Sequence, residues 1–200
     1  ISRYFIVAIL FTLISILKPG FASGSHIKVL LAEAAIIGVA AIGQTLVIIT
    51  GGIDMSIPWI FNGAAMAAFA FSNTFTGADF GLVIIGILTV GFLLGMINGI
   101  CVTYLGIPSI VMTLGTNTIL QGAVTGLTSG SIVGQAPNIL KVLSTGSFFG
   151  ISVAFLFWIV LAVIVLLLLR KTGYGRALYA LGNNRTVAKF SGIHVKRVEA

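Results

Sequence analysis

The stretch that decides the fold is ISVAFLFWIVLAVIVLLLLRK, residues 151–171. Residues 151–169 carry no charge, and the basic residues Arg170 and Lys171 follow directly. A helix needs about 20 predominantly apolar residues to cross the hydrocarbon core of a bilayer. A Lys/Arg pair directly after such a run marks the cytoplasmic side of the membrane. The stretch therefore predicts a transmembrane helix that ends in the cytoplasm.

The rest of the chain has the composition of a membrane protein. Of 200 residues, 58% are hydrophobic and 8% are charged, and the mean hydropathy is +1.17. Soluble chains carry roughly 25% charged residues, so a soluble globular domain is excluded. The 25 glycines suit helices that pack closely in lipid. The composition predicts an all-α membrane protein built as a multi-span transmembrane helix bundle.

Apolar stretches upstream of residue 151 predict the other crossings. Residues 80–140 are uncharged, and the Asn, Gly and Pro residues at 98–108 divide them into spans at 80–97 and 109–127. Further spans are expected at 4–17, 34–53 and 55–78. Residues 1–169 would then form a bundle of about six spans, with loops at 72–79 and 128–150 outside. The amino end, with Arg3, and the break at 98–108 would lie inside.

Positive charge is concentrated in residues 170–200. The chain has a net charge of +7, and most of its 11 Lys and Arg residues follow position 169: Arg170, Lys171, Arg176, Arg185, Lys189, Lys196 and Arg197. This pattern predicts a basic cytoplasmic segment. A segment tethered to so many spans does not favour nucleic-acid binding.

A break between two spans is expected at ITGGIDMSIP, residues 49–58. Gly51 and Gly52 can end one helix, and Asp54 or Ser56 can cap the next, whose first turn tolerates Pro58. Two interpretations stay open. The segment is either a tight interhelical turn or an irregular stretch at membrane depth that lines a water-filled cavity.

The remaining polar residues of the apolar part are mostly neutral: Gln44, Asn62, Asn98, Thr113, Thr116, Asn117 and Gln121. Such groups suit an uncharged polyhydroxylated solute, although interhelical hydrogen bonding is the alternative for each. Two glycine trios, at 91, 95 and 99 and at 122, 126 and 130, lie at helical spacing and predict helix packing seams.

Catalytic and metal-binding patterns are absent from the sequence. It contains no Gly-Lys dipeptide and hence no phosphate-binding loop, so we expect no ATPase activity of its own. Its two histidines are far apart, and its one cysteine, Cys101, forms no intrachain disulfide. We expect no enzymatic function, no metal and no cofactor.

The basic segment contains one further helix signal. In TGYGRALYALGNNRTVAKFSGI, residues 172–193, Asn183 or Asn184 can start a short helix over 185–190, and Gly192 can end it. Residues 172–175 are interpreted as a linker. The short helix is either a docking element for a partner or a helix lying on the membrane surface.

Three motifs carry a resemblance to a known family: GQTLVIITGGIDMS at 43–56, GMINGICVTYLGIPSIVMTLGTNTILQG at 95–122, and GYGRALYALGNNRTVAKFSGI at 173–193. They resemble the permease subunit of ATP-binding-cassette (ABC) importers for ribose, xylose, galactose and related monosaccharides. One departure is Met55-Ser56-Ile57-Pro58, where the family usually has Leu-Ser-Val-Gly. The chain begins with Ile1 and stops at Ala200 within the basic segment, and permeases of this family continue with further membrane helices. The resemblance therefore implies the amino-terminal part of a larger permease whose carboxy-terminal helices are missing.

The resemblance implies a helical permease like those of vitamin B12 (type II) importers. It would work in a bacterial inner membrane as a permease dimer with two cytoplasmic ATPase subunits, which use the ATP, and a periplasmic or lipid-anchored sugar-binding protein. A monosaccharide such as ribose would cross by alternating access. The residues expected to shape the pathway are Gly51, Gly52, Asp54, Asn98, Pro108 and Asn117. Those expected to couple the chain to the ATPases are Arg176, Asn183, Arg185, Ala188, Ser191 and Gly192.

Other functions remain open from the sequence. Within the same transporter class, the substrate could be a branched-chain amino acid or a nucleoside. An ion-coupled secondary transporter would need intramembrane ionisable pairs, which the pattern does not favour. A non-transporting membrane subunit would need neither a polar pathway nor an ATPase partner.

Overall fold

The computed structural model describes residues 2–72, 74–75, 79–131 and 134–199. These residues are mostly helical, with one short hairpin. The elements are α1 (Ser2–Leu17), α2 (Gly24–Ile49), α3 (Ile57–Phe71), α4 (Phe80–Leu105), α5 (Ser109–Thr128), α6 (Asn138–Thr145), β1 (Ser147–Phe148), β2 (Ile151–Ser152), α7 (Val153–Lys171), α8 (Gly173–Asn183), α9 (Arg185–Phe190) and α10 (Val195–Glu199).

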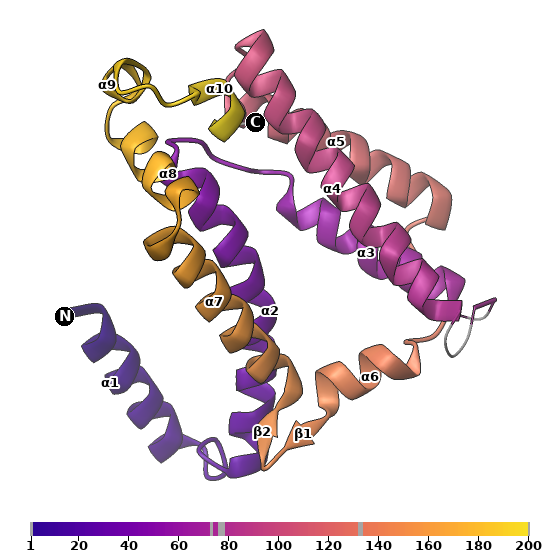
Figure 1. Cartoon of the computed structure of the whole chain (residues 1–200). Helices are drawn as coiled ribbons and strands as arrows, with labels where there is room; N and C mark the ends of the chain where they lie inside the picture. Colours follow the sequence, from indigo (N-terminus) through magenta and orange to yellow (C-terminus); the bar gives the residue numbers. More distant parts are fainter. Residues whose placement is uncertain (1, 73, 76–78, 132–133, 200) are drawn as a thin grey trace.

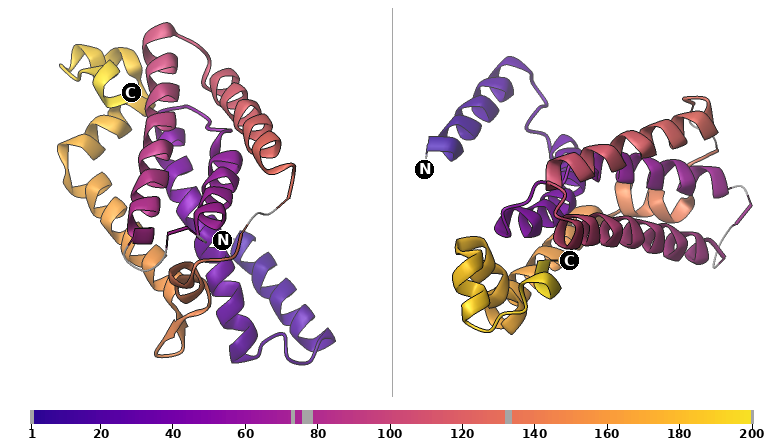
Figure 2. Two further views of the ribbon diagram at one scale, coloured as in Figure 1. Left: turned by 90° about the vertical axis from the view of Figure 1, so that its right-hand side faces the viewer. Right: turned by 90° about the horizontal axis from the view of Figure 1, so that it is seen from above.

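The helices form two groups (Figure 1). In one group α2 packs along α7, and α8 and α9 continue from the end of α7. In the other group α3, α4 and α5 pack together. The two groups are joined at one end by the segment between α2 and α3 and by α10, and at the other end by α6 and the antiparallel hairpin of β1 and β2 (Figures 1 and 2). Helix α1 stands apart from both groups.

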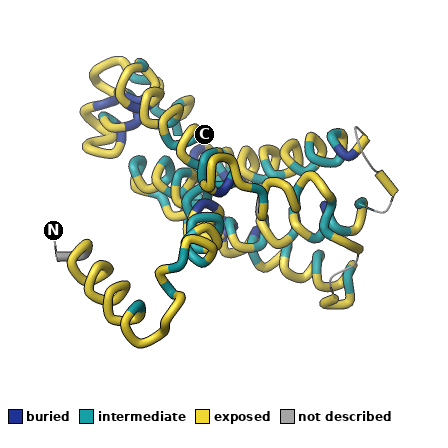
Figure 3. The backbone as a smooth tube through the Cα atoms, turned by 90° about the horizontal axis from the view of Figure 1, so that it is seen from below, coloured by how far each residue is buried: buried dark blue, intermediate teal, exposed yellow. Residues whose placement is uncertain are grey.

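The pattern of burial is the opposite of that in a soluble protein: most residues along the helices are exposed or half-buried (Figure 3). Large apolar side chains are exposed along the helices, including Ile37 at 71% and Phe92 at 70%. The buried polar side chains are Ser56, Asn98, Thr103, Thr113, Thr116 and Ser152. Apolar atoms gain nothing by leaving lipid, whereas polar groups must be satisfied inside the protein. The fold is that of an all-α membrane protein.

Each predicted span contains a helix. Within the described residues, α2, α4 and α7 are long and apolar enough to cross a membrane by length and composition, and residues 4–17 and α3 are shorter apolar helices. The count of about six crossings therefore stays a prediction. The loop predicted at 72–79 and the end of the span predicted at 55–78 include residues 73 and 76–78, which lie outside the described part of the chain.

Helix α2 differs at both ends from the span predicted at 34–53, whose membrane limits stay a prediction. Helix α2 begins at Gly24, where the Ser23 side chain accepts a hydrogen bond from the His26 N–H. Its 26 residues measure about 39 Å, more than the core thickness of about 30 Å. The helix can therefore carry Lys28 and Glu33 outside the hydrocarbon. It ends at Ile49, before Gly51 with its φ of 86°.

The break predicted at 98–108 is shorter than expected. Helix α4 continues through Asn98 to Leu105, and the chain leaves the helix only at Gly106, in the left-handed region with a φ of 71°. Asn98 does not break the helix because hydrogen bonds from other elements satisfy its buried side chain. No local pattern in the sequence reveals those partners.

Two other segments have more structure than expected. The loop predicted at 128–150 contains α6 and the first strand of the hairpin, and β2 takes the first two residues of the span predicted at 151–169. The linker predicted at 172–175 includes the start of α8. Thr172 caps α8 by accepting from the Gly175 N–H at 3.2 Å. A Cβ on Gly175 would overlap the Leu169 carbonyl group. This glycine therefore permits a tight junction between α7 and α8, which is a different role from that of a linker.

The packing seams predicted at the two glycine trios are only partly seen: a Cβ at Gly91 would lie 4.0 Å from the Ile60 Cγ2 of α3. A Cβ at Gly95, Gly122 or Gly126 would meet nothing within 4 Å, and residue 130 lies beyond the end of α5. The close helix contact lies instead at Gly38 of α2, where a Cβ would overlap the Trp158 ring of α7.

Candidate functional site

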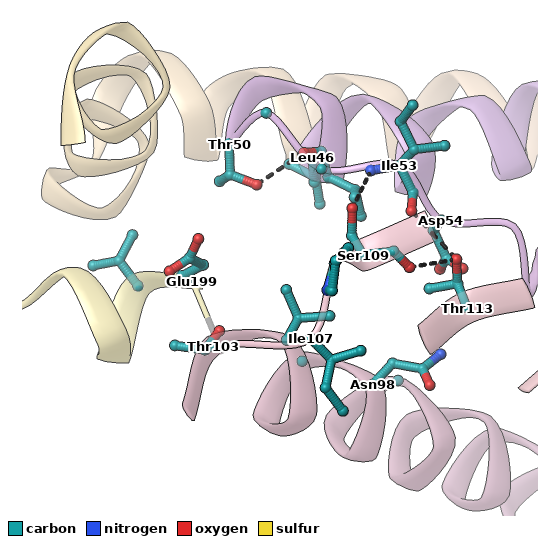
Figure 4. A pocket seen from close by; sticks show the side chains of 18 of the residues that line it. Leu46, Thr50, Ile53, Asp54, Asn98, Thr103, Ile107, Ser109, Thr113 and Glu199 are labelled. Atoms are coloured by element: carbon teal, nitrogen blue, oxygen red, sulfur yellow. Dashed lines mark hydrogen bonds between the residues drawn. The ribbon is translucent and has the colours of Figure 1, made fainter. Parts of the chain in front are cut away.

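A cavity of about 580 Å³ lies where the two helix groups meet (Figure 4). One wall is the end of α2 with residues 50–54, and another is α4 between Gly95 and Thr103. Residues 106–109 and Thr113 close a third side. Tyr174 and Leu178 of α8, Arg185 of α9, and Val198 and Glu199 of α10 complete the lining. The cavity therefore connects the apolar helices with the basic segment, residues 170–200.

The irregular backbone between α2 and α3 is held by the start of α5. The Ile53 N–H donates to the Ser109 Oγ at 3.2 Å, and the Met55 N–H donates to the Thr113 Oγ1 at 2.9 Å. Gly52 folds back on α2, donating from its N–H to the Val47 carbonyl at 3.0 Å. Irregular backbone is tolerated within a membrane protein where other groups satisfy its polar atoms. This segment meets that condition and also lines the cavity.

Asp54 is oriented by its own loop. Its Oδ1 accepts from the Ser56 N–H at 2.8 Å and from the Ser56 Oγ at 2.6 Å. Ser56 occupies the N-cap position of α3 without a side-chain cap bond, and Pro58 lies in the first turn. The helix therefore begins where the sequence predicted, with Ser56 at the N-cap position, but no side-chain cap bond from Asp54 or Ser56 to the helix is seen. The tight turn lines the cavity, and its position at membrane depth stays a prediction.

A buried hydrogen-bond chain joins three helices behind this wall. The Asn98 Nδ2 of α4 donates to the Ser56 Oγ at 3.3 Å, and the Thr116 Oγ1 of α5 donates to the Asn98 Oδ1 at 2.6 Å. Ser56 is 0% exposed and Asn98 is 6% exposed. Asn98 lines the cavity, but its side-chain bonds serve interhelical packing, which was the alternative reading of the neutral polar residues.

Most of the predicted pathway residues come together. Gly51, Gly52, Asp54, Asn98 and Pro108 all line the cavity. Asn117 does not: it lies on α5, outside the cavity lining, with a buried Oδ1 that has no hydrogen-bond partner within the described residues.

Three polar residues among the rest of the cavity lining lay outside the predicted pathway set, although Thr113 was one of the neutral polar residues that the sequence singled out. Ser109 and Thr113 hold the irregular segment, and the buried Thr103 Oγ1 lacks a hydrogen-bond partner within the described chain. Ser109 follows Pro108 at the start of a helix, where serine is favoured, and that signal could have revealed it. Nothing local distinguishes Thr103 from other threonines.

The short helix predicted in the basic segment is confirmed with its bounds, Arg185–Phe190. The Asn184 Oδ1 accepts from the Thr186 and Val187 N–H groups at 3.0 and 3.1 Å. Gly192 follows the helix with a φ of 81°. These are the cap and the terminator that the sequence indicated.

The residues predicted for coupling fall into different environments. Arg176, Asn183 and Ser191 are exposed, whereas Arg185 forms an ion pair with Glu199 of α10. Ala188 is only 2% exposed and is buried within this chain. A direct contact from its methyl group to a partner is therefore not available, and the exposed apolar residues of α9 are Val187 at 58% and Phe190 at 85%.

Helix α8 touches the cavity wall directly. A Cβ on Gly182 would overlap the Ile49 carbonyl oxygen at the end of α2, so the two backbones approach as closely as glycine allows. Leu178 and Leu181 of α8 are both 3% exposed. The basic segment is therefore packed firmly against the residues that precede Gly51 and Gly52.

Metal chemistry has no support among the residues that the structure describes, since no group of three or more His, Cys, Asp or Glu side chains lies close enough to hold an ion. The cavity instead offers neutral hydroxyl and backbone groups, the Asp54 carboxylate and the Arg185–Glu199 pair.

Comparison with known proteins agrees with the resemblance seen in the motifs. Residues 27–200 match the family described as "Branched-chain amino acid transport system / permease component". The ribose import permease protein RbsC of Bacillus subtilis (strain 168) is 38% identical over 193 residues, which cover 96% of this chain and 59% of that protein. No solved structure matches the chain.

Two further relatives are described as autoinducer 2 import system permease proteins. LsrC of Yersinia enterocolitica is 36% identical over 193 residues, covering 94% of this chain and 52% of its own length. LsrC of Salmonella typhi is 32% identical over 192 residues, which cover 96% of this chain and 55% of that protein. The chain spans little more than half the length of these relatives. It is an integral membrane protein and belongs to the family described as "Branched-chain amino acid transport system / permease component".

Proposed function

We propose that this chain forms part of the permease subunit of an ABC importer that moves a small polar solute, such as the monosaccharide ribose, across a bacterial inner membrane. The observation that carries the proposal is the cavity shared by the irregular α2–α3 segment and the basic segment. Its volume of about 580 Å³ lies within the range of about 300–1,000 Å³ that is typical of small-molecule sites. Relatives described as import permeases support the assignment.

The lining supports a neutral solute better than an ion. Apart from Asp54, the charged residues of the cavity are Arg185 and Glu199, which neutralise one another. The remaining polar groups are hydroxyls, an amide and backbone atoms around the glycines. Such groups both donate and accept hydrogen bonds, as sugar hydroxyls require.

The proposed source of energy lies outside this chain. Residues 170–200 would face the cytoplasm, and α9 would dock on an ATPase subunit through Val187 and Phe190. Ala188, on the opposite and buried face of α9, would hold the helix against the rest of the chain. Movement of α9 would pass through α8 and Gly182 to the end of α2. The glycine pair and Asp54 would then shift relative to α4, opening or closing the cavity.

The wider assembly is proposed from the resemblance. The full permease would have the vitamin B12-type fold, pair with a second permease, bind two ATPase subunits and receive solute from a periplasmic or lipid-anchored binding protein. The chain would use no cofactor itself. Alternating access at the permease interface would complete transport.

Solute uptake by the reconstituted transporter tests this proposal. The full-length protein would be placed in proteoliposomes with its ATPase and binding-protein partners, and labelled ribose, leucine and adenosine would be supplied separately. We expect ATP-dependent uptake of ribose. Uptake of ribose driven by an ion gradient without ATP would identify a secondary transporter, and no uptake of any solute would indicate a non-transporting subunit.

The same three labelled solutes also distinguish a sugar importer from an importer of amino acids or nucleosides. The family description names branched-chain amino acids, so leucine is the main competitor. ATP-dependent uptake of leucine or adenosine with no ribose uptake would keep the importer and overturn the sugar assignment.

A further inference from the structure

Two grooves outside the central cavity meet at one residue, Tyr104, near the end of α4. One groove, of about 740 Å³, lies between the end of α4 and helices α9 and α10. The other, of about 790 Å³, runs along α4. Tyr104 lines both and is 52% exposed. The grooves border the central cavity, with which they share Gly95 and Arg185, and Phe190 of the proposed docking helix also lines the first groove.

The first groove is strongly basic. Its lining includes five basic side chains: Arg185, Lys189, His194, Lys196 and Arg197. Glu199 pairs with Arg185, and the Lys196 Nζ lies 5.2 Å from the centre of the Tyr104 ring. Lys189 and Arg197 form no ion pair within the described residues. The groove therefore keeps a net positive charge that suits an anion.

The second groove is apolar. It is lined by Phe92, Gly95, Met96, Ile100 and Tyr104, which follow one face of α4 at a spacing of about four residues. From Phe92 to Tyr104 the helix rises about 18 Å, close to the thickness of one leaflet, about half of the 30 Å core. A Cβ at Gly95 would meet nothing within 4 Å, so this part of the helix surface is open.

A basic groove joined to an apolar groove as long as one leaflet suits a single amphiphilic ligand with a negatively charged head and an apolar tail. Basic residues at the end of a membrane helix attract anionic headgroups, and a tyrosine at the junction is typical of the membrane interface. An acidic protein surface would use the basic groove but would leave the apolar face of α4 uncovered. A free phosphate ion would likewise use only the first groove.

We propose that these two grooves form a binding site for a phospholipid with a negatively charged headgroup. The headgroup lies among Lys189, Lys196 and Arg197, and one acyl chain lies along α4 from Tyr104 toward Phe92. The bound lipid bridges α4 and the α9–α10 pair, adding to the contact that Lys196 makes with Tyr104. The proposal goes beyond the transport function and does not depend on the solute.

Lipid retention measured by native mass spectrometry tests the site. The full-length protein in mild detergent would be mixed with dioleoyl phosphatidylglycerol or dioleoyl phosphatidylcholine, and the bound lipid counted. We expect selective retention of phosphatidylglycerol. In Lys189→Gln/Arg197→Gln, retention should fall about 25-fold, because each basic residue contributes roughly fivefold to the binding of an anionic lipid.

Matched control variants distinguish binding in the two grooves from general effects of lost charge or added side-chain volume. Arg170→Gln/Lys171→Gln removes the same charge from exposed positions outside the basic groove and should retain the lipid. Ile100→Trp fills the apolar groove and should reduce retention. Ile97→Trp, at an exposed position of α4 that does not line the groove, should not.

Several outcomes would overturn the proposal. Equal retention of the two lipids would show no headgroup site. Competition by inorganic phosphate with no effect of Ile100→Trp would indicate a site for a free anion. If Lys189→Gln/Arg197→Gln kept the lipid but lost capture by the ATPase subunit, the basic groove would bind an acidic protein surface. None of these results depends on which solute is transported.

Discussion

At the scale of single residues, Ser56 has the most demanding position in the chain. Its hydroxyl donates to the Asp54 carboxylate and accepts from the Asn98 amide, and its side chain is fully buried. One small residue thus connects the irregular segment to α4. A polar group buried without a partner is costly, so each member of this chain depends on the others.

Ser56→Ala should lower both stability and transport. The substitution leaves the Asn98 Nδ2 without its partner, which should reduce the free energy of unfolding by about 1–3 kcal/mol. Thermal unfolding of the purified full-length protein in detergent measures the change. Ser15→Ala, which removes only an exposed bond to the Phe11 carbonyl, is the control and should have little effect. Equal melting of Ser56→Ala and the native protein would refute the role of the hydrogen-bond chain.

Ala188→Glu should uncouple transport without preventing membrane insertion. Because Ala188 lies on the buried face of α9, an unpaired carboxylate there would cost several kcal/mol, more than a helix of six residues can offset. We expect α9 to leave its place, with loss of ATPase capture and of uptake. Ala188→Ser, which keeps the small volume, should retain both. Normal uptake in Ala188→Glu would contradict the coupling role of α9.

At the scale of elements, the pairing of α2 with α7 depends on Gly38. Gly38→Ala should destabilise the protein by about 1–3 kcal/mol, because the added methyl group would overlap the Trp158 ring. Gly43→Ala lies on the same helix and meets nothing within 4 Å, so the higher helix propensity of alanine should leave it neutral or slightly stabilised. Thermal unfolding compares the two variants. Equal stability would show that α2 and α7 are not closely packed at this point.

The contact of α8 with the end of α2 is the proposed mechanical link. Gly182→Ala would overlap the Ile49 carbonyl oxygen and push α8 away, so we expect ATP-dependent uptake to fall while ATPase capture persists. The control is Gly173→Ala on the same helix, where the nearest atom, the Arg176 Nη2, would lie 3.9 Å away. If both variants transported equally well, the force would have to travel by another route.

Elements with local signals were predictable, and elements held by distant partners were not. Asn184 and Gly192 define α9 within a few residues, so its bounds followed from the sequence. The continuation of α4 through Asn98 depends on Ser56 and Thr116, which are remote in the chain. The start of α8 depends on Gly175 fitting beside Leu169. A glycine looks the same in sequence whether it loosens a linker or permits a tight contact.

The same reasoning explains which site residues were found. Gly51, Gly52, Asp54 and Pro108 stand out because they interrupt apolar helices, and all of them line the cavity. Thr113 was one of several neutral polar candidates and Ser109 follows Pro108 at a helix start, but only the fold shows that they hold the irregular segment. Asn117 has the right chemistry but lies outside the cavity lining.

At the scale of the whole molecule, the chain combines an exposed apolar surface with a polar interior where its helix groups meet. The cavity is bounded on one side by membrane helices and on the other by the basic segment. This arrangement supports the central claim that movement of the basic segment controls a solute path through the cavity.

Thiol labelling at Ile107 tests this claim most directly. Ile107 lines the cavity and is half-buried, and replacing Cys101 with serine leaves Ile107→Cys as the only thiol among the 200 residues printed here; any cysteine elsewhere in the full-length permease would be replaced as well. ATP-driven ribose uptake by the reconstituted transporter would be measured before and after reaction with a bulky maleimide. The account predicts that labelling abolishes uptake and that ribose slows labelling. Full uptake by completely labelled protein would show that the solute does not pass through this cavity.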